Sequence, residues 1–413
     1  MKKSTIRVSF IKRLWLVLAV LGPGLITASA DNDAPGIATY SMAGSRYGYN
    51  FLWLLLVVTF GEVFIQEMAA RLGAITGKGT ADLIREKFGV KITLFAMVCL
   101  LVANLGTTIA EFAGIAAGAE LFGLSRYIVV PVITVIIAFI VMGGSYKNVE
   151  KLLLILCLSA IAYVISAFVL KPDWGEVLRS AVTPQFILEP EYILAVLATI
   201  GTTITPWGIF YMQGSVVDKG VEAENYGLTK VDVIFGAVWG NIISAFIVIT
   251  TSATLFLHGI HVEEAEQAAL ALVPLAGDWA KVLFASGLVG ASILAAMVLP
   301  LSTVYAITEA FGWERGLDQK RRDAPIFYGL YIAVIAASSI FVLIPGLPLF
   351  KIMLFSQSIN AILLPVLLVL VLILANDRET MGEWKNKRFQ NIFSILLTAM
   401  ITAITIALFV LQF

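Results

Sequence analysis

Two short polar segments stand out because each interrupts a long apolar stretch of the chain. Residues 30–36 (ADNDAPG) carry two carboxylates, Asp31 and Asp33, and residues 202–208 (TTITPWG) carry three threonine hydroxyls beside Pro206. Carboxylate, carbonyl and hydroxyl oxygens are the ligands that hard divalent cations prefer. The two segments therefore predict a cation site, provided that the fold brings them together.

The composition of the whole chain predicts a membrane protein. Of 413 residues, 59% are apolar and 14% are charged, whereas an ordinary soluble domain is about 45–50% apolar and about 25% charged. Lys+Arg and Asp+Glu both number 28, so the formal net charge is zero. Nucleic acid, which favours a basic surplus, is therefore excluded as a partner. We expect an integral membrane protein that contacts the lipid bilayer.

The sequence contains no pattern typical of an enzyme. The two cysteines, Cys99 and Cys157, stand alone in apolar runs, so they form neither a disulfide framework nor a metal-binding pair. There is also no nucleophile–base pair, no cluster of histidine ligands and no glycine-rich phosphate loop. We therefore expect no catalytic activity, no cofactor and no obligatory protein partner.

The apolar segments define the expected fold class. A helix that crosses the hydrocarbon core needs about 20 predominantly apolar residues. The predicted spans are residues 14–44 (interrupted), 51–72, 92–121, 127–143, 150–170, 190–217 (interrupted), 232–257, 280–310, 326–345, 350–375 and 390–412. The expectation is an all-α polytopic membrane protein of eleven transmembrane helices, in which residues 1–413 form a single transmembrane domain.

The basic residues sort to one side of the membrane when the loops are numbered alternately. Of the 28, 22 fall in the set that includes the amino terminus. The other set holds Arg46, Arg126, Lys171, Arg179, Lys281 and Lys351. Because cytoplasmic loops carry an excess of Lys and Arg, we expect a cytoplasmic amino terminus and an extracellular carboxyl terminus, in a prokaryotic plasma membrane.

The two polar segments lie in the first and the sixth predicted spans. Proline and glycine break a helix there, and bare backbone groups are tolerated in lipid only where they face protein or a wet cavity. Two breaks five spans apart predict an inverted repeat of five plus five helices. Repeat 1 covers about 14–170, repeat 2 covers about 190–375, and 390–412 is an additional helix. Such a fold binds its substrate at mid-membrane between broken helices 1 and 6, where freed carbonyls favour a cation.

Several segments resemble a known family. GPGLITASADNDAPGIATYSMAGSRYGYNFLW (22–53) is similar to the first helix of NRAMP-type divalent-metal transporters, whose motif there is Asp-Pro-Gly-Asn. GEVFIQEMAARLGAITGKGTADLIREKFG (61–89) resembles the second helix and the loop after it. Further similar segments are IAEFAGIAAGAELFGL (109–124), FSQSINAILLP (355–365) and MGEWKNKRF (381–389). The resemblance implies a transporter with eleven helices, an inverted repeat and alternating access.

The resemblance also implies a set of metal ligands, from which this chain departs. The family's metal-binding aspartate falls on Asp33, and the asparagine ligand after it is replaced by Gly36. The family's Met-Pro-His in the sixth helix becomes Thr205-Pro206-Trp207, while an acid of the third helix becomes Thr108 and a later one remains as Glu111. The implied ligands are the Asp33 carboxylate, the Ala30 and Thr202 carbonyls, Thr205 and Gln357. Accessory residues are Asp31, Gly36, Glu111 and Trp207.

These departures indicate the transported ion. Soft sulfur favours transition metals, whereas an all-oxygen site favours Mg²⁺ and Mn²⁺. Two missing side-chain ligands suit an ion that keeps several waters. We therefore expect import of partly hydrated Mg²⁺, and also Mn²⁺, as in the NRAMP-related magnesium transporters that the sequence resembles. Loss of the family's histidine and third-helix acid predicts transport uncoupled from protons, driven by about 2.3 kcal/mol per charge per 100 mV.

Two alternatives remain open on the sequence alone. One is a proton-coupled importer of Mn²⁺ or other transition metals, because Glu62, Glu67, Glu111 and Glu120 lie in or at the end of predicted spans. The other is an amino-acid transporter of the same architecture, in which half-helix amino termini would bind a carboxylate.

Overall fold

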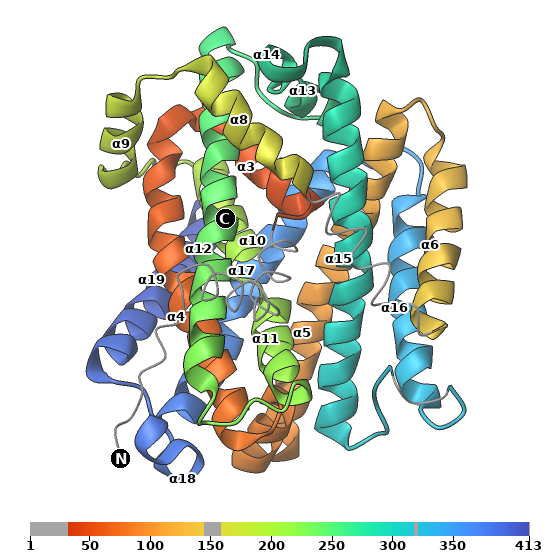
Figure 1. Cartoon of the computed structure of the whole chain (residues 1–413), viewed down its shortest axis with the longest axis vertical. Helices are drawn as coiled ribbons and strands as arrows, with labels where there is room; N and C mark the ends of the chain where they lie inside the picture. The colour runs from red at the N-terminus through yellow and green to blue at the C-terminus, as the bar shows by residue number, and fades with distance from the viewer. Residues whose placement is uncertain (1–31, 144–157, 318–320, 413) are drawn as a thin grey trace, which may run out of the picture.

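A computed structural model describes residues 32–143, 158–317 and 321–412. Within these ranges the regular structure is helical and contains no strand. The longer helices run along the long axis of the molecule, with α9, α13 and α14 towards one end and α18 at the other (Figure 1). The predicted all-α class is therefore confirmed.

The first half of the described chain contains α3 (Ala34–Tyr47), η1 (Gly48–Phe51), α4 (Leu52–Thr76), α5 (Thr80–Leu121), α6 (Arg126–Met142), η2 (Leu158–Ala160), α8 (Ile161–Leu170), α9 (Trp174–Val182), α10 (Pro190–Thr203) and α11 (Pro206–Asp218). The second half contains α12 (Tyr226–Thr254), η3 (Phe256–His258), α13 (Ala265–Leu270), α14 (Val273–Ala276), η4 (Gly277–Trp279), α15 (Ala280–Phe311), α16 (Pro325–Val342), α17 (Leu349–Asn376), α18 (Arg378–Met381), η5 (Gly382–Trp384) and α19 (Arg388–Gln412).

Eight helical stretches of the described chain are long and apolar enough to cross a membrane, and α6 and α8 are shorter apolar helices. The predicted spans at 14–44 and 150–170 lie partly outside the described residues, so the count of eleven stays a prediction. The largest difference in a predicted boundary is at the start of α5. Helix α5 begins at Thr80, well before the predicted start at residue 92, and is kinked where Gly89 adopts a φ of 74°. Charged residues before the kink hid this segment from a search for apolar runs.

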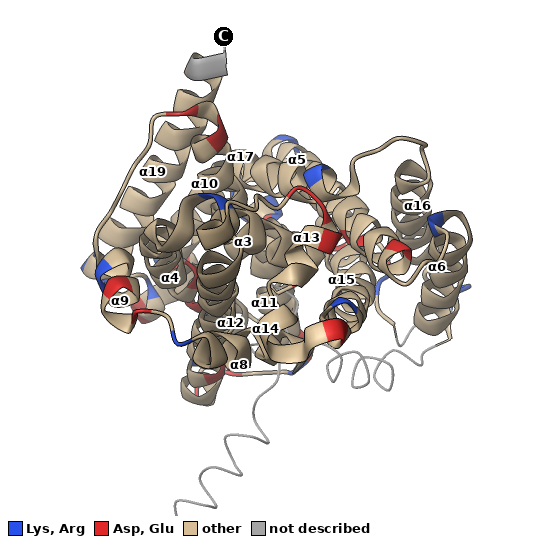
Figure 2. Cartoon of the chain, turned by 90° about the horizontal axis from the view of Figure 1, so that it is seen from above, with Lys and Arg blue, Asp and Glu red and all other residues tan. Residues whose placement is uncertain are grey.

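The two sets of loops predicted from charge lie at opposite ends of the molecule. In every ion pair among the described residues, the acidic and the basic side chain lie at the same end of the molecule. At one end, Arg46 pairs with Glu191 and Lys281 pairs with Glu266. At the other, Lys87 pairs with Asp377. Figure 2 views the first end, which carries α9, α13 and α14, and shows residues of both signs there.

Glycines allow the central helices to approach closely. A Cβ on Gly201 of α10 would lie 1.9 Å from the backbone oxygen of Gln357 in α17, and a Cβ on Gly114 of α5 would lie 2.2 Å from the Cβ of Ala34 in α3. Both contacts leave no room for a side chain. Small residues at helix contacts are typical of membrane bundles, where van der Waals packing replaces the hydrophobic effect between helices. These contacts bring α3, α5, α10 and α17 together around the two polar segments.

Candidate metal-ion site

The predicted break in the sixth span is present. Helix α10 ends at Thr203, and α11 begins at Pro206. Between them Thr205 is extended, with φ −86° and ψ 138°, because a residue before proline is disfavoured in the helical region. The side-chain oxygen of Thr205 caps α11 by accepting a hydrogen bond from the amide of Gly208 at 3.2 Å. Both Thr205 and Thr202 are buried, and the Thr202 hydroxyl has no hydrogen-bond partner.

Asp33 occupies the equivalent place at the start of α3. It is buried and extended, and its Oδ1 accepts a hydrogen bond from the amide of Gly36 at 2.7 Å. Pro35 is accommodated in the first turn, where a helix needs no amide donor. Gly36 therefore contributes its backbone amide to the Asp33 carboxylate. Ala30 and Asp31, which were also predicted to contribute, lie outside the described residues.

A polar stripe on α5 faces these two helix ends. It consists of Asn104, Thr107, Thr108 and Glu111, which are all fully buried and follow the i, i+3, i+4, i+7 spacing of one helix face. The Glu111 side chain lies beside the Asp33 carboxyl group. At the far end of the stripe, Asn104 donates to the hydroxyl of Thr303 in α15 at 2.7 Å. The sequence prediction included Glu111 and Thr108 but not the stripe, although its spacing in an apolar helix is a signal that could have found it.

Gln357 lies in α17 at the contact with α10. Its Oε1 accepts a hydrogen bond from Asn360 at 2.9 Å, and Asn360 also donates to the hydroxyl of Thr107 at 2.8 Å. Gln357 in turn donates to the hydroxyl of Ser356 at 3.2 Å. Asn360 was not predicted from sequence, because its position in an apolar run did not reveal the neighbours that it joins.

Trp207 is enclosed by the surrounding helices. Its side chain is fully buried, and the indole ring packs edge-on against Tyr211 with a centroid distance of 5.9 Å. Its backbone oxygen accepts a hydrogen bond from Ser302 of α15 at 3.1 Å. The indole nitrogen has no hydrogen-bond partner, and since indole offers only a donor it cannot ligate a cation.

The helices that carry these residues contact one another, but few of the residues themselves are in direct contact. Asp33 adjoins Glu111, and a hydrogen bond of 2.9 Å between Tyr40 and Thr203 joins α3 to the end of α10. No hydrogen bond between described residues joins Asp33 to Thr205 or Gln357. The helices that carry the described ligands are therefore packed against one another, but no hydrogen bond joins the ligands themselves.

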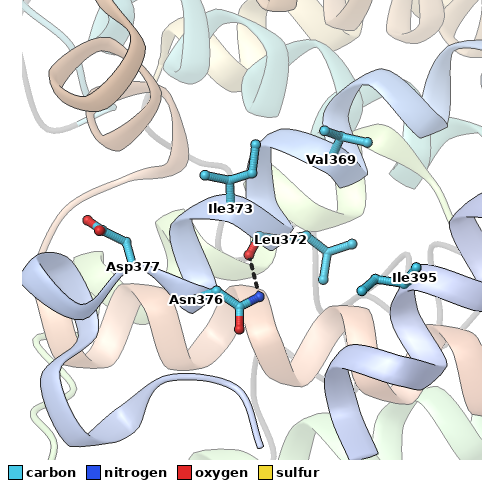
Figure 3. Close-up of a pocket in the computed structure, with 6 residues that line it drawn as sticks. All are labelled: Val369, Leu372, Ile373, Asn376, Asp377 and Ile395. Atoms are coloured by element: carbon cyan, nitrogen blue, oxygen red, sulfur yellow. Dashed lines mark hydrogen bonds between the residues drawn. The ribbon is translucent and has the colours of Figure 1, made fainter. Parts of the chain in front are cut away.

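A cavity that the described residues form lies elsewhere. A groove of about 520 Å³ runs between α17 and α19 and is lined by Val369, Leu372, Ile373, Asn376, Asp377 and Ile395. Figure 3 shows the aliphatic side chains along the groove and the two polar residues at its end. Its lining contains none of the predicted ligands, and mostly aliphatic walls between two membrane-spanning helices suit lipid rather than a metal ion.

Comparison with known proteins identifies the family to which the chain belongs. A family model described as natural resistance-associated macrophage protein-like (Nramp) matches residues 24–411. The chain belongs to the Nramp family. The resemblance found in the sequence is thereby confirmed.

Relatives of the chain extend over nearly its whole length. A divalent metal cation transporter MntH of Verminephrobacter eiseniae is 26% identical over 399 residues, which are 94% of this chain and 88% of that protein. MntH of Yersinia enterocolitica is 26% identical over 401 residues, 95% of each chain. The crystal structure of the Eremococcus coleocola manganese transporter, bound to an aromatic bis-isothiourea compound, matches with a TM-score of 0.74 at 21% identity, covering 97% of this chain and 88% of that one. This last match supports the Nramp fold.

Proposed function

We propose that this Nramp protein imports divalent metal cations, with Mg²⁺ as the preferred substrate and Mn²⁺ as a second one. The observation that carries the preference is Thr205, which caps α11 where the family resemblance expects a methionine. A hydroxyl at this point makes the proposed ligand set oxygen only, and oxygen ligands favour Mg²⁺ and Mn²⁺ over softer metals. Relatives named as divalent metal cation transporters support the broader class of substrate and the absence of enzymatic activity.

The proposed ligands are the Asp33 carboxylate, the Thr202 carbonyl, Thr205 and Gln357, with the Ala30 carbonyl from outside the described residues. Only Asp33 brings a charge. Mg²⁺ demands six oxygens and sheds water reluctantly, so the ion is expected to keep several waters. The buried Thr202 hydroxyl, which has no hydrogen-bond partner among the described residues, is suited to accept a hydrogen bond from such a water.

The position of the site supports passage of an ion through the membrane. The carbonyls at the end of α10 have no partner within the helix, and the carboxyl end of a helix carries partial negative charge. We place Asp33 and the end of α10 in equivalent broken helices of two inverted repeats, 14–170 and 190–375, with the amino terminus on the cytoplasmic side. Asp33 beside Glu111 would repel a carboxylate, so an amino acid is not proposed as the substrate.

We further propose that import is driven by membrane potential without a proton. Trp207 stands where the family resemblance expects a histidine, and indole does not titrate. A specific contact favours the alternative, a proton-coupled Mn²⁺ importer. Asp33 and Glu111 are two adjacent buried carboxyl groups, and such a pair can share a proton. The manganese transporter named among the structural relatives favours the same alternative.

Flux into liposomes tests both proposals. We expect potential-driven Mg²⁺ influx without acidification of the lumen, and loss of uptake by at least about tenfold in Asp33→Ala, because even partners of a metal ligand cost 10- to 100-fold. Asp278→Ala, which removes an exposed carboxylate of the η4 segment, is the control and should transport normally. Uptake of Mn²⁺ but not Mg²⁺, with acidification, would favour the alternative. Undiminished Mg²⁺ uptake by Asp33→Ala would show that the site is placed wrongly.

A further inference from the structure

A second group of buried oxygens lies between α4 and α12, apart from the proposed ligands. It consists of Glu62 and Gln66 of α4 and Asn241 of α12, whose exposed fractions are 1%, 2% and 6%. Glu62 and Gln66 are four residues apart, so they share one face of α4. Glu62 lies close to the middle of α4, where a carboxylate is expensive to bury and marks an ion path or a functional site by default.

The hydrogen bonds of Asn241 fix the orientation of its amide group. The Nδ2 atom donates one hydrogen to the Glu62 carboxylate and the other to the backbone oxygen of Ala237 at 2.9 Å. Exchanging the nitrogen and the oxygen would place the Oδ1 acceptor against two other acceptors, so this orientation holds. The Oδ1 atom, on the same small planar group, must therefore lie close to the Glu62 carboxylate.

Two acceptor atoms of this group have no donor. Neither Oδ1 of Asn241 nor Oε1 of Gln66 has a hydrogen-bond partner among the described residues, although both atoms are fully buried. Buried polar atoms are satisfied in the large majority of cases, and an orphan calls for an explanation such as an ion or a water. Both of these oxygens lie on side chains next to a buried carboxylate. Each needs a cation or a hydrogen-bond donor, and one such centre between them would serve both.

The chemistry of the group decides which ligand fits. We propose that Glu62, Gln66 and Asn241 bind a monovalent metal cation of the size of Na⁺. One carboxylate balances the single charge of a monovalent ion, so such an ion is neutralised here without help from other charged groups. None of these three residues belongs to the proposed ligand set of the divalent substrate, so the group is a separate site. A proton on Glu62 could be donated to only one of the two acceptors, but a metal ion is shared by all three oxygens.

The cation site is connected to the start of α3. Asn32, which precedes Asp33, donates to the backbone oxygen of Gly240 at 3.1 Å and accepts from the hydroxyl of Ser244 at 3.1 Å. Asn241 lies between these two residues in the same turn of α12. A cation bound to Asn241 would therefore stabilise the turn that holds Asn32 in place. The consequence is that Na⁺ supports divalent-cation transport without touching the divalent ion.

Thermal unfolding of the purified full chain tests the proposal directly. The chain is titrated with NaCl against choline chloride at constant ionic strength, without divalent cation. A ligand that binds the native state raises the melting temperature in a saturable way. We expect this rise with Na⁺ in the wild type and its loss in Glu62→Gln. Glu120→Gln, which alters a half-exposed carboxylate paired with Arg126, should keep the rise.

Two further measurements protect the test against misfolded variants. A melting-temperature shift on adding Mn²⁺ should remain in Glu62→Gln, which shows that the variant is folded and that the divalent site is separate. Gln66→Met, which removes one oxygen at nearly constant volume, should raise the half-saturating Na⁺ concentration about tenfold. A wild type that responds equally to Na⁺ and choline would overturn the proposal and leave a buried water between the side chains. An Na⁺ shift that persists unchanged in Glu62→Gln, or stabilisation by acid in place of Na⁺, would also overturn it.

Discussion

Two residues at the helix breaks each combine a structural role with the proposed role as ligand. Asp33 caps α3 through Oδ1, which leaves its second oxygen to face Glu111 or an ion. Thr205 caps α11 through its hydroxyl oxygen. A cap contributes about 1 kcal/mol to a helix, so substitution at either position changes both the helix end and the chemistry of the site. Test variants must separate the two effects.

Thr205→Met is predicted to shift the metal preference towards softer ions. The thioether supplies a soft ligand, so uptake of the soft ion Cd²⁺ should rise relative to Mg²⁺ uptake. Because Met cannot accept the hydrogen bond from Gly208, the variant should also lose about 1 kcal/mol of capping. Ratios of initial uptake rates in liposomes measure the preference. Thr205→Ser keeps both the hydroxyl and the cap and should behave like the wild type. An unchanged ratio in Thr205→Met would show that this side chain does not contact the ion.

At the scale of helices, the site depends on how closely α10 approaches α17. Gly201 lies one residue before Thr202, and a Cβ there would lie 1.9 Å from the backbone oxygen of Gln357. Two predicted ligands, Thr202 and Gln357, are thus held together by a backbone contact that only glycine permits. The adjacent hydrogen bonds from Asn360 to Gln357 and Thr107 add α5 to the same assembly.

Gly201→Ala is predicted to separate α10 from α17 and to impair both stability and uptake. Overpacking of this kind costs about 1–3 kcal/mol, so the melting temperature should fall and Mg²⁺ uptake should be largely lost. Gly214→Ala is a matched control, because a Cβ on this helical glycine of α11 meets nothing within 4 Å. Alanine there should be neutral or stabilising by about 0.5–1 kcal/mol. Equal melting temperatures for the two variants would contradict the close contact.

The helices themselves were largely predictable from sequence, but the contacts between residues of different helices were not. The length of the apolar segments predicted the membrane-spanning helices, and Pro206 with the threonines before it predicted the break after α10. Asp33 was found because a carboxylate is costly in an apolar segment. The role of Asn360 and the Gly201 contact could not be found, since each depends on a residue more than 150 positions away in the chain. The placement of Ala30 and Asp31 stays a prediction.

At the scale of the whole molecule, one end of the bundle is closed by polar contacts around the start of α5. The Glu309 carboxylate of α15 accepts a hydrogen bond from the Asp82 amide at 2.9 Å and pairs with Arg315 at 3.5 Å. Gln213 of α11 accepts from Thr80 at 2.6 Å and donates to the backbone oxygen of Lys78 at 2.8 Å. These contacts tie the second half of the broken helix to α5 and α15. The sorting of basic residues predicts that this is the cytoplasmic end.

Alternating access requires that this end open while the other closes, so the contacts must be weak enough to break. Gly79 shows how tightly they fit, since a Cβ there would lie 2.0 Å from the Glu309 Oε1 atom. Removing the Glu309 carboxylate leaves the first turn of α5 without its acceptor from α15. The start of α5 should then open more often, and the equilibrium should move towards the state open at this end.

Hydrogen exchange of the Asp82 amide measures this opening. In Glu309→Ala we expect its exchange to be at least about tenfold faster than in the wild type, because an amide exchanges through local opening once its hydrogen bond is lost. Glu266→Ala breaks the exposed pair with Lys281 at the opposite end and should leave the Asp82 amide unchanged. If the closure opens as a unit, the segment around Gln213 should lose protection together with Asp82 in Glu309→Ala. Faster exchange confined to Asp82 would instead show that Glu309 only caps α5 and does not hold this end of the bundle closed.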